Sequence, residues 1–93
     1  MFSGGSYDEV ARWLHNFLTS HAKRENAQAE VDLEAGDKRE GTSYGARLRL
    51  GRGVALLGDF DYAEVAQGRG SLAWCEALAQ RTRAAVCQLS VAA

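Results

Sequence analysis

The sequence predicts an α+β fold, a two-layer sandwich in which a three-stranded antiparallel meander carries two helices on one face, in the order α-β-β-β-α. Three observations predict it. Apolar residues recur at helical spacing near both ends of the chain and alternate with polar residues in the middle. The 93 residues are 46% hydrophobic and 25% charged, the balance of a folded globular protein. That length suits one domain over residues 1–93, with a flexible N-terminal segment at residues 1–5.

The first helix is predicted at residues 7–22. Ser6 and Glu9 form a capping box, in which each side chain satisfies a free backbone N–H at the start of a helix. Lys23 and Arg24 follow the predicted end, where positive charge suits the helix dipole. The stripe expected to face the core consists of Tyr7, Val10, Ala11, Leu14, Phe17, Leu18 and His21.

Two strands are predicted next, at residues 26–35 and 44–50, joined by a polar loop at residues 36–42. One register satisfies both of their faces. When Ala35 pairs with Tyr44, the inner positions pair apolar residues and the outer positions pair acids with arginines. The resulting pairs are Leu33–Ala46 and Val31–Leu48 on the inner face, with Asp32–Arg47 and Glu30–Arg49 on the outer face.

A third strand is predicted at residues 54–60, after a connection at residues 51–53. Continued alternation turns Ala55 and Leu57 to the outer face, where they form an apolar spot beside Arg47. An apolar spot on an otherwise charged face indicates a binding surface. The expected inner pairs are Leu50–Val54, Leu48–Leu56 and Tyr44–Phe60.

A short helical turn at residues 62–67 and a long final helix complete the fold. Asp61 and Glu64 form the pattern of a second capping box, and Gly68 closes the turn. Ser71 is the expected cap of the final helix. The buried stripe of that helix is predicted to comprise Leu72, Cys75, Leu78, Ala79, Thr82, Ala85, Val86 and Leu89.

Charge and cysteine content limit the function. A formal net charge of -1 provides no broad field for attracting nucleic acid or an anionic membrane surface, and no long apolar run predicts a membrane span. Cys75 and Cys87 are expected to be free, buried thiols, and with His15 and His21 they lack the spacing of a zinc site. We therefore expect a cytoplasmic protein without a metal or other cofactor.

The best candidate ligand site is an anion-binding segment formed by Gly68, Arg69, Gly70 and Ser71. A flexible turn, a cation and a hydroxyl there precede a helix whose first N–H groups are free. The segment is not a phosphate-binding loop, so ordinary helix capping is the favoured interpretation. A small anionic ligand remains the alternative.

The other polar clusters favour structure over chemistry. Asp59, Asp61 and Glu64 could surround a hard cation, but capping accounts for two of them. Cys75 is the most tempting nucleophile, and its place on an apolar stripe predicts burial and low reactivity. The sequence therefore predicts no catalytic residues and no metal ligands, and an enzyme is less expected than a binding protein.

The favoured function is a protein-interaction or adaptor module that forms a homodimer or binds another protein. Trp13 and Trp74 lie beside the apolar stripes of their helices, where rings either cover the ends of a thin core or contribute to recognition surfaces. The predicted interaction surface consists of Trp13, Arg47, Arg49, Ala55, Leu57 and Trp74. The alternative is a small-molecule binder or enzyme that holds an anionic group at residues 68–71.

A further alternative is RNA binding. The predicted element order is similar to that of double-stranded-RNA-binding domains, which read A-form RNA by shape and phosphate contacts. In this chain RNA binding would use Arg49, Arg52 and Arg69. The resemblance covers element order alone, because those domains carry lysines at the start of the second helix, whereas residues 71–76 here contain no lysine and one acid.

Overall fold

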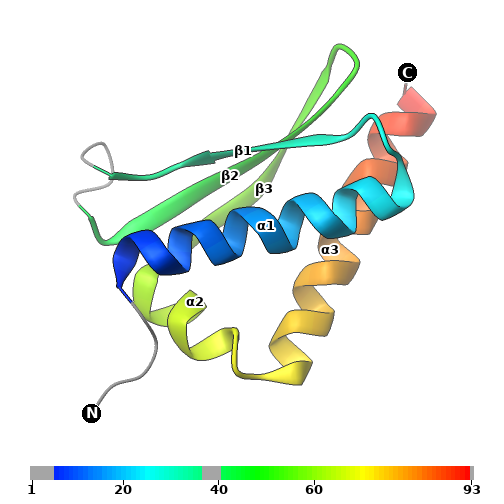
Figure 1. Cartoon of the computed structure of the whole chain (residues 1–93). Helices are drawn as coiled ribbons and strands as arrows, with labels where there is room; N and C mark the ends of the chain where they lie inside the picture. The colour runs from blue at the N-terminus through cyan, green and yellow to red at the C-terminus, as the bar shows by residue number, and fades with distance from the viewer. Residues whose placement is uncertain (1–5, 37–40, 93) are drawn as a thin grey trace.

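The computed structural model describes residues 6–36 and 41–92, and its elements follow the predicted order (Figure 1). They are α1 (Tyr7–Glu25), β1 (Glu30–Glu34), β2 (Ser43–Leu50), β3 (Gly53–Asp61), α2 (Tyr62–Gly68) and α3 (Leu72–Ala92). The strands form one antiparallel sheet in the order β1-β2-β3. This arrangement confirms the predicted fold class. Residues 1–5, predicted to be flexible, lie outside the described residues.

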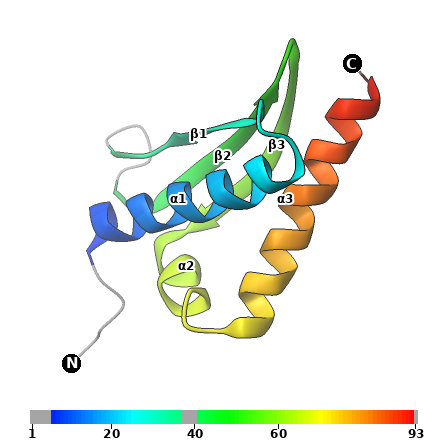
Figure 2. The same ribbon diagram turned by 45° about the vertical axis from the view of Figure 1, so that its right-hand side comes forward.

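The long helices cover one face of the sheet. α1 packs along β1, whereas α3 crosses beneath β3 and rises toward the hairpin that joins β2 to β3 (Figure 2). Near the end of α1 the helices are joined by a hydrogen bond from Asn26 Nδ2 to Ser90 Oγ, at 3.4 Å. The most deeply buried side chains, each at most 1% exposed, include Val10, Leu14, Leu18, Tyr44, Leu48, Val65 and Val86.

The start of α1 agrees with the prediction, and its end does not. Ser6 Oγ accepts the backbone N–H of Glu9 at 3.2 Å, so the predicted cap is formed. The helix continues to Glu25, three residues beyond the predicted end. The added residues are good helix formers, and Asn26 terminates the helix by donating its N–H to Ala22 O at 3.1 Å.

Two tyrosines fasten the start of α1 to the sheet. The rings of Tyr7 and Tyr44 are stacked with centroids 4.6 Å apart, and Tyr44 Oη donates to Tyr7 O at 2.8 Å. Tyr7 Oη donates to Ser43 O and accepts the N–H of Gly36 at 3.0 Å. Burial, and then the proximity of Tyr7, raise the pKa of Tyr44, which therefore stays a neutral donor.

The β1–β2 register is the predicted one. Val31 is opposite Leu48, and both side chains are buried, at 6% and 0% exposed. β1 is shorter than predicted, because residues 26–29 form a turn. There the side chain of Asn26 accepts the N–H of Gln28 at 2.9 Å, and its backbone carbonyl accepts the N–H of Ala29 at 2.9 Å.

The β2–β3 register is the predicted one only near Tyr44, which pairs with Phe60. A β-bulge between Ala46 and Arg47 shifts the pairing of the rest of β3 by one residue. Gly58, which is opposite Ala46 at the bulge, has φ +146°. The predicted pairs Leu50–Val54 and Leu48–Leu56 are therefore wrong. The observed partners of Leu50 and Leu48 are Gly53 and Ala55.

Because of the bulge, four residues of β3 face the side opposite to the predicted one. Leu57 is buried at 4% exposed and Ala55 packs against the core, so the prediction that these two face outward is wrong. Val54 and Leu56 face outward instead, at 59% and 68% exposed. Since a one-residue slip reverses every side chain of a strand, the apolar spot on the outer face persists with different members.

The last helices keep their predicted positions with two corrections. Asp61 precedes α2 without forming a side-chain cap, contrary to the second capping box. Ser71 does cap α3, because its Oγ accepts the N–H of Trp74 at 3.3 Å. Leu72 lies at the helix start and is 77% exposed, so it does not belong to the buried stripe.

Candidate functional site

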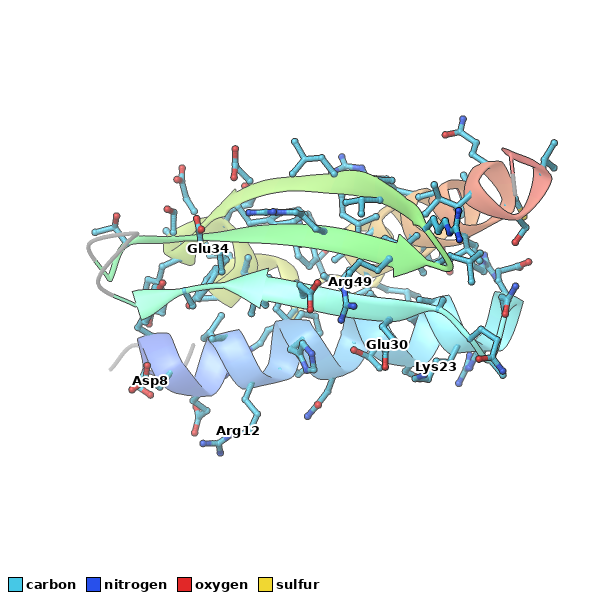
Figure 3. The ribbon with its side chains drawn as sticks, turned by 90° about the horizontal axis from the view of Figure 1, so that it is seen from above. Asp8, Arg12, Lys23, Glu30, Glu34 and Arg49 are labelled. Carbon is cyan, nitrogen blue, oxygen red and sulfur yellow. The ribbon has the colours of Figure 1, made fainter. Side chains whose placement is uncertain are left out.

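The sheet face away from the helices is the candidate site. We use the name outer face for six of its exposed residues: Glu30, Asp32, Arg47, Arg49, Val54 and Leu56. These six form two adjacent rows across the sheet. In each, an acid of β1 is opposite an arginine of β2, which is opposite an apolar residue of β3. The acidic, basic and apolar residues thus form three parallel stripes, and Figure 3 shows Glu30 and Arg49 on neighbouring strands.

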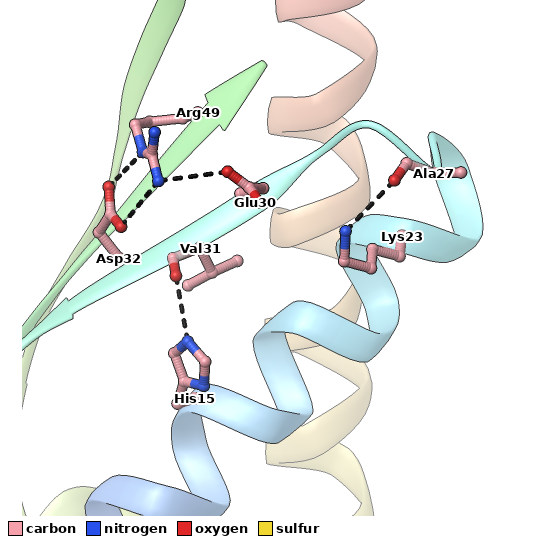
Figure 4. A network of polar contacts seen from close by, with 7 residues as sticks. All are labelled: His15, Lys23, Ala27, Glu30, Val31, Asp32 and Arg49. Carbon is pink, nitrogen blue, oxygen red and sulfur yellow. Dashed lines mark hydrogen bonds and ion pairs between the residues drawn. The ribbon is translucent and has the colours of Figure 1, made fainter. Parts of the chain in front are cut away.

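The acidic and basic stripes meet at one guanidinium. Nη2 of Arg49 lies 3.2 Å from Asp32 Oδ1 and 3.3 Å from Glu30 Oε2, while Nε of Arg49 donates to Asp32 Oδ2 (Figure 4). The hydrogen bonds with Asp32 raise the pKa of Arg49 above its ordinary value. Sequence pairing alone predicted an Asp32–Arg47 ion pair. Asp32 instead binds the diagonal arginine, and Arg47 lies across from Leu56.

Val54 and Leu56 were missed as site residues. The signal for them is present in the two-residue loop between Leu50 and Gly53, which begins with Gly51 at φ +60°. Loops of this length are the commonest hairpin connections and favour glycine at positive φ. Such a loop would have set the shifted register and turned Val54 and Leu56 outward.

The structure does not bring the predicted interaction residues together. Arg47 and Arg49 lie on the outer face, whereas Trp13 and Trp74 lie on the helical side. The two indole rings are half-buried with centroids 6.3 Å apart, and Trp13 stacks on Phe17 at 5.0 Å. Trp74 also covers Gly68, where an added Cβ would lie 2.3 Å from the ring. Both tryptophans therefore fill the junction of the helices.

Three backbone donors of the candidate anion segment are already used. Arg69, Gly70 and Ser71 donate their N–H groups to Val65 O at 2.9 Å, Gln67 O at 3.2 Å and Gly68 O at 2.8 Å, respectively. The guanidinium of Arg69 lies 3.6 Å from Glu9 Oε2. An anion at this turn would compete with Glu9 for the guanidinium of Arg69, and the N–H groups of residues 69–71 already have acceptors. The geometry favours the capping interpretation.

The cysteines are free, and each has a local contact. Cys75 Sγ approaches Gly68 O at 3.6 Å, and burial raises the pKa of its thiol. Cys87 is exposed rather than buried as predicted, and its Sγ lies 3.6 Å from Glu25 Oε2. Desolvation, and then the contact with Glu25, raise the pKa of Cys87. Both thiols are consequently poor nucleophiles.

The histidines are positioned by the fold. Nε2 of His15 lies 3.1 Å from Val31 O at the edge of β1 (Figure 4). The ring of His21 packs on Phe17 with centroids 4.5 Å apart. Desolvation, followed by the charges of Arg24 and Arg83, lowers the pKa of His21. Within residues 6–36 and 41–92, no group of three His, Cys, Asp or Glu side chains could hold a metal ion.

Comparisons with known proteins identify no relative from which a function could be transferred. Among the described residues, no helix is long and apolar enough to cross a membrane. The chain matches no protein-family model, no curated protein and no solved structure. Its function therefore has to be inferred from the geometry of its own residues.

Proposed function

We propose that this chain is a protein-interaction module that self-associates through the outer face of its sheet. The observation that supports the proposal is the exposure of Val54 and Leu56, at 59% and 68%, on the face that the helices leave uncovered. Large apolar side chains that adjoin one another at such exposure are typical of binding surfaces.

The arginines beside this apolar pair are expected to orient a bound partner more than to strengthen its binding. Arg47 and Arg49 of β2 are directly opposite Leu56 and Val54 of β3. Arginine is enriched in protein interfaces because its planar guanidinium binds carboxylates while its stem covers apolar surface. A partner that buries Val54 and Leu56 therefore meets Arg47 and the ion-paired Arg49 at the rim, and Arg47 is the cation placed to fix its orientation.

Sedimentation velocity over a range of protein concentrations tests the proposal. The wild-type chain is expected to shift from monomer toward dimer as concentration rises. Leu56→Lys places a solvated ammonium at the centre of the apolar pair and is expected to hold the chain monomeric. Leu72→Lys is the matched control, because Leu72 is at least as exposed as Leu56 but lies at the start of α3, away from the outer face.

Two results would contradict the proposal. The first is a wild-type chain that stays monomeric up to near-millimolar concentration. The second is loss of association in Leu72→Lys to the same degree as in Leu56→Lys. Circular dichroism of both variants shows whether the fold is retained, which an exposed substitution is expected to allow.

A further inference from the structure

We propose that the edge of β3 pairs with β3 of a second copy, joining two sheets into one continuous sheet. The inference rests on the proposed function and gives the partner and the geometry of that association. β3 is one of two edge strands in the sheet order β1-β2-β3. An edge strand presents a row of backbone N–H and C=O groups without a strand partner, which is a template for pairing.

The β1 edge is less suited to pairing than the β3 edge. Nε2 of His15 lies within hydrogen-bond distance, 3.1 Å, of the backbone carbonyl oxygen of Val31 on β1. The outward side chains of β1 include Glu30 and Asp32, so two β1 strands would bring like charges together. Natural proteins use such contacts and charges to prevent edge pairing. β3 carries no charged side chain from Gly53 to Gly58.

The free part of the β3 edge is its first half. Arg81 Nη1 donates to Leu57 O at 3.4 Å and marks the far limit. The two-residue loop makes Leu50 and Gly53 the pair that bond to each other, and the antiparallel ladder then alternates. The N–H and C=O groups of Val54 and Leu56 therefore point away from β2.

Those same two residues define the register of pairing. If Val54 of one copy is opposite Leu56 of the other, the outward backbone groups of both residues meet their counterparts across a two-fold axis at Ala55. Their side chains also share one face, because directly opposed residues in a ladder do so. Four apolar side chains, two from each copy, then form a cluster flanked on either side by the arginines of β2.

Charge at the ends of the strand agrees with this antiparallel arrangement. Arg52 precedes β3, whereas Asp59 and Asp61 end it. An antiparallel partner brings its acidic end to the basic end of the first copy, and the reverse pair forms at the opposite end. A parallel partner would place like charges side by side. The charges thus select the two-fold pairing, which closes at a dimer instead of extending into a filament.

Residue-resolved amide hydrogen exchange of the full chain, at low micromolar and at near-millimolar concentration, tests the pairing. The amides of Val54 and Leu56 are expected to exchange at least about tenfold more slowly at high concentration, because they gain hydrogen bonds only in the dimer. The amide of Ala55 faces β2 and is the internal control, with a much smaller change. Equal exchange at both concentrations for Val54 and Leu56 overturns edge pairing.

Disulfide trapping tests the register. In a chain carrying Cys75→Ser and Cys87→Ser, a mixture of Val54→Cys and Leu56→Cys variants is expected to form cross-linked dimers in excess of either variant alone. The reason is that each residue faces the other type across the axis. A mixture of Val54→Cys with Leu72→Cys is the control without such a contact. Equal cross-linking in all mixtures contradicts the register.

The outcomes separate this inference from the function on which it rests. Sedimentation as a dimer, with unprotected Val54 and Leu56 amides and no preferred cross-link, indicates that the outer faces pack on each other. Edge pairing is then wrong, and the interaction function stands. Sedimentation as a monomer at every concentration removes both.

Discussion

The guanidinium of Arg49 neutralises part of the acidic charge on the outer face. Arg49 binds Asp32 through two nitrogen atoms and also contacts Glu30. A phosphate at Arg49 would compete with these two carboxylates. Two of the three arginines of the RNA alternative therefore already form ion pairs, because Arg69 also lies 3.6 Å from Glu9. Arg47, across from Leu56, is better placed to orient a protein partner.

The lowered pKa of His21 is expected to make the stability of the fold depend on pH. Desolvation, and then Arg24 and Arg83, lower the pKa of His21 in the folded state, and its Nδ1 is buried without a hydrogen-bond partner in the described structure. The unfolded chain therefore binds a proton at higher pH than the folded chain does. The contribution of a neutral His21 is fully present above the ordinary pKa of 6.5 and is lost as pH falls below it.

We expect the wild-type chain to lose more stability than His21→Leu does when the pH is lowered from neutral to about 5, because leucine cannot take up a proton. Urea unfolding of both chains at several pH values measures the difference. The stability of the two chains should diverge only below the ordinary histidine pKa. Parallel pH profiles would show that His21 has no part in the pH dependence.

At the scale of elements, the sequence predicts a register wherever two independent signals agree. For β1 and β2, alternation of apolar residues and alternation of opposite charges select the same pairing, and the structure has it. For β3, residues 54–57 are all apolar, so alternation cannot choose a phase. The hairpin loop then sets the register at one end, while the buried Tyr44–Phe60 pair sets it at the other.

These two registers of β3 differ by one residue, and a bulge absorbs the difference. The prediction carried the register of Tyr44 and Phe60 through the whole strand, which misplaced Val54, Ala55, Leu56 and Leu57. Arg47 and Arg49 were placed correctly because β2 pairs with β1 on the other side. The tryptophans could not be placed, since their location depends on how the helices cross, which no local pattern encodes.

Gly58 is the residue that permits the bulge. Its φ of +146° strains any L side chain, and an added Cβ would lie 3.4 Å from both Arg81 Nη1 and Phe60 Cζ. We expect Gly58→Ala to lower the free energy of unfolding by about 1–3 kcal/mol, the usual cost of a residue held in such a conformation. Gly70→Ala is the matched control, because its Cβ would meet only Gln67 O at 3.6 Å.

Urea unfolding of Gly58→Ala and Gly70→Ala measures the two costs. A Gly58→Ala chain that keeps wild-type stability would show that the bulge does not depend on glycine. Amide exchange of the same variant shows whether β3 has slipped into the unbulged register, in which Leu57 would face outward. Such a slip would replace the members of the apolar pair without removing it.

At the scale of the molecule, the helices and the bulge together produce an asymmetric sheet. α1 and α3 bury one face of the sheet, and His15 contacts a backbone carbonyl at the β1 edge. The large apolar side chains that remain exposed on the sheet lie together on β3. Of the four large apolar side chains that the described structure exposes, the other two, Leu72 and Val91, lie at opposite ends of α3. Association at β3 is therefore the arrangement that covers adjacent apolar side chains with one contact.

The proposed association at β3 would couple folding to concentration. A dimer that forms only from folded chains stabilises the folded state by mass action, so the midpoint of thermal unfolding rises with protein concentration. We expect this rise in the wild-type chain and in Val91→Lys, whose site is 88% exposed but lies at the end of α3. Leu56→Lys should unfold at one temperature whatever the concentration, because its β3 no longer associates. Scanning calorimetry at low and high concentration distinguishes these cases, and a wild-type midpoint independent of concentration would exclude a dimer formed by folded chains.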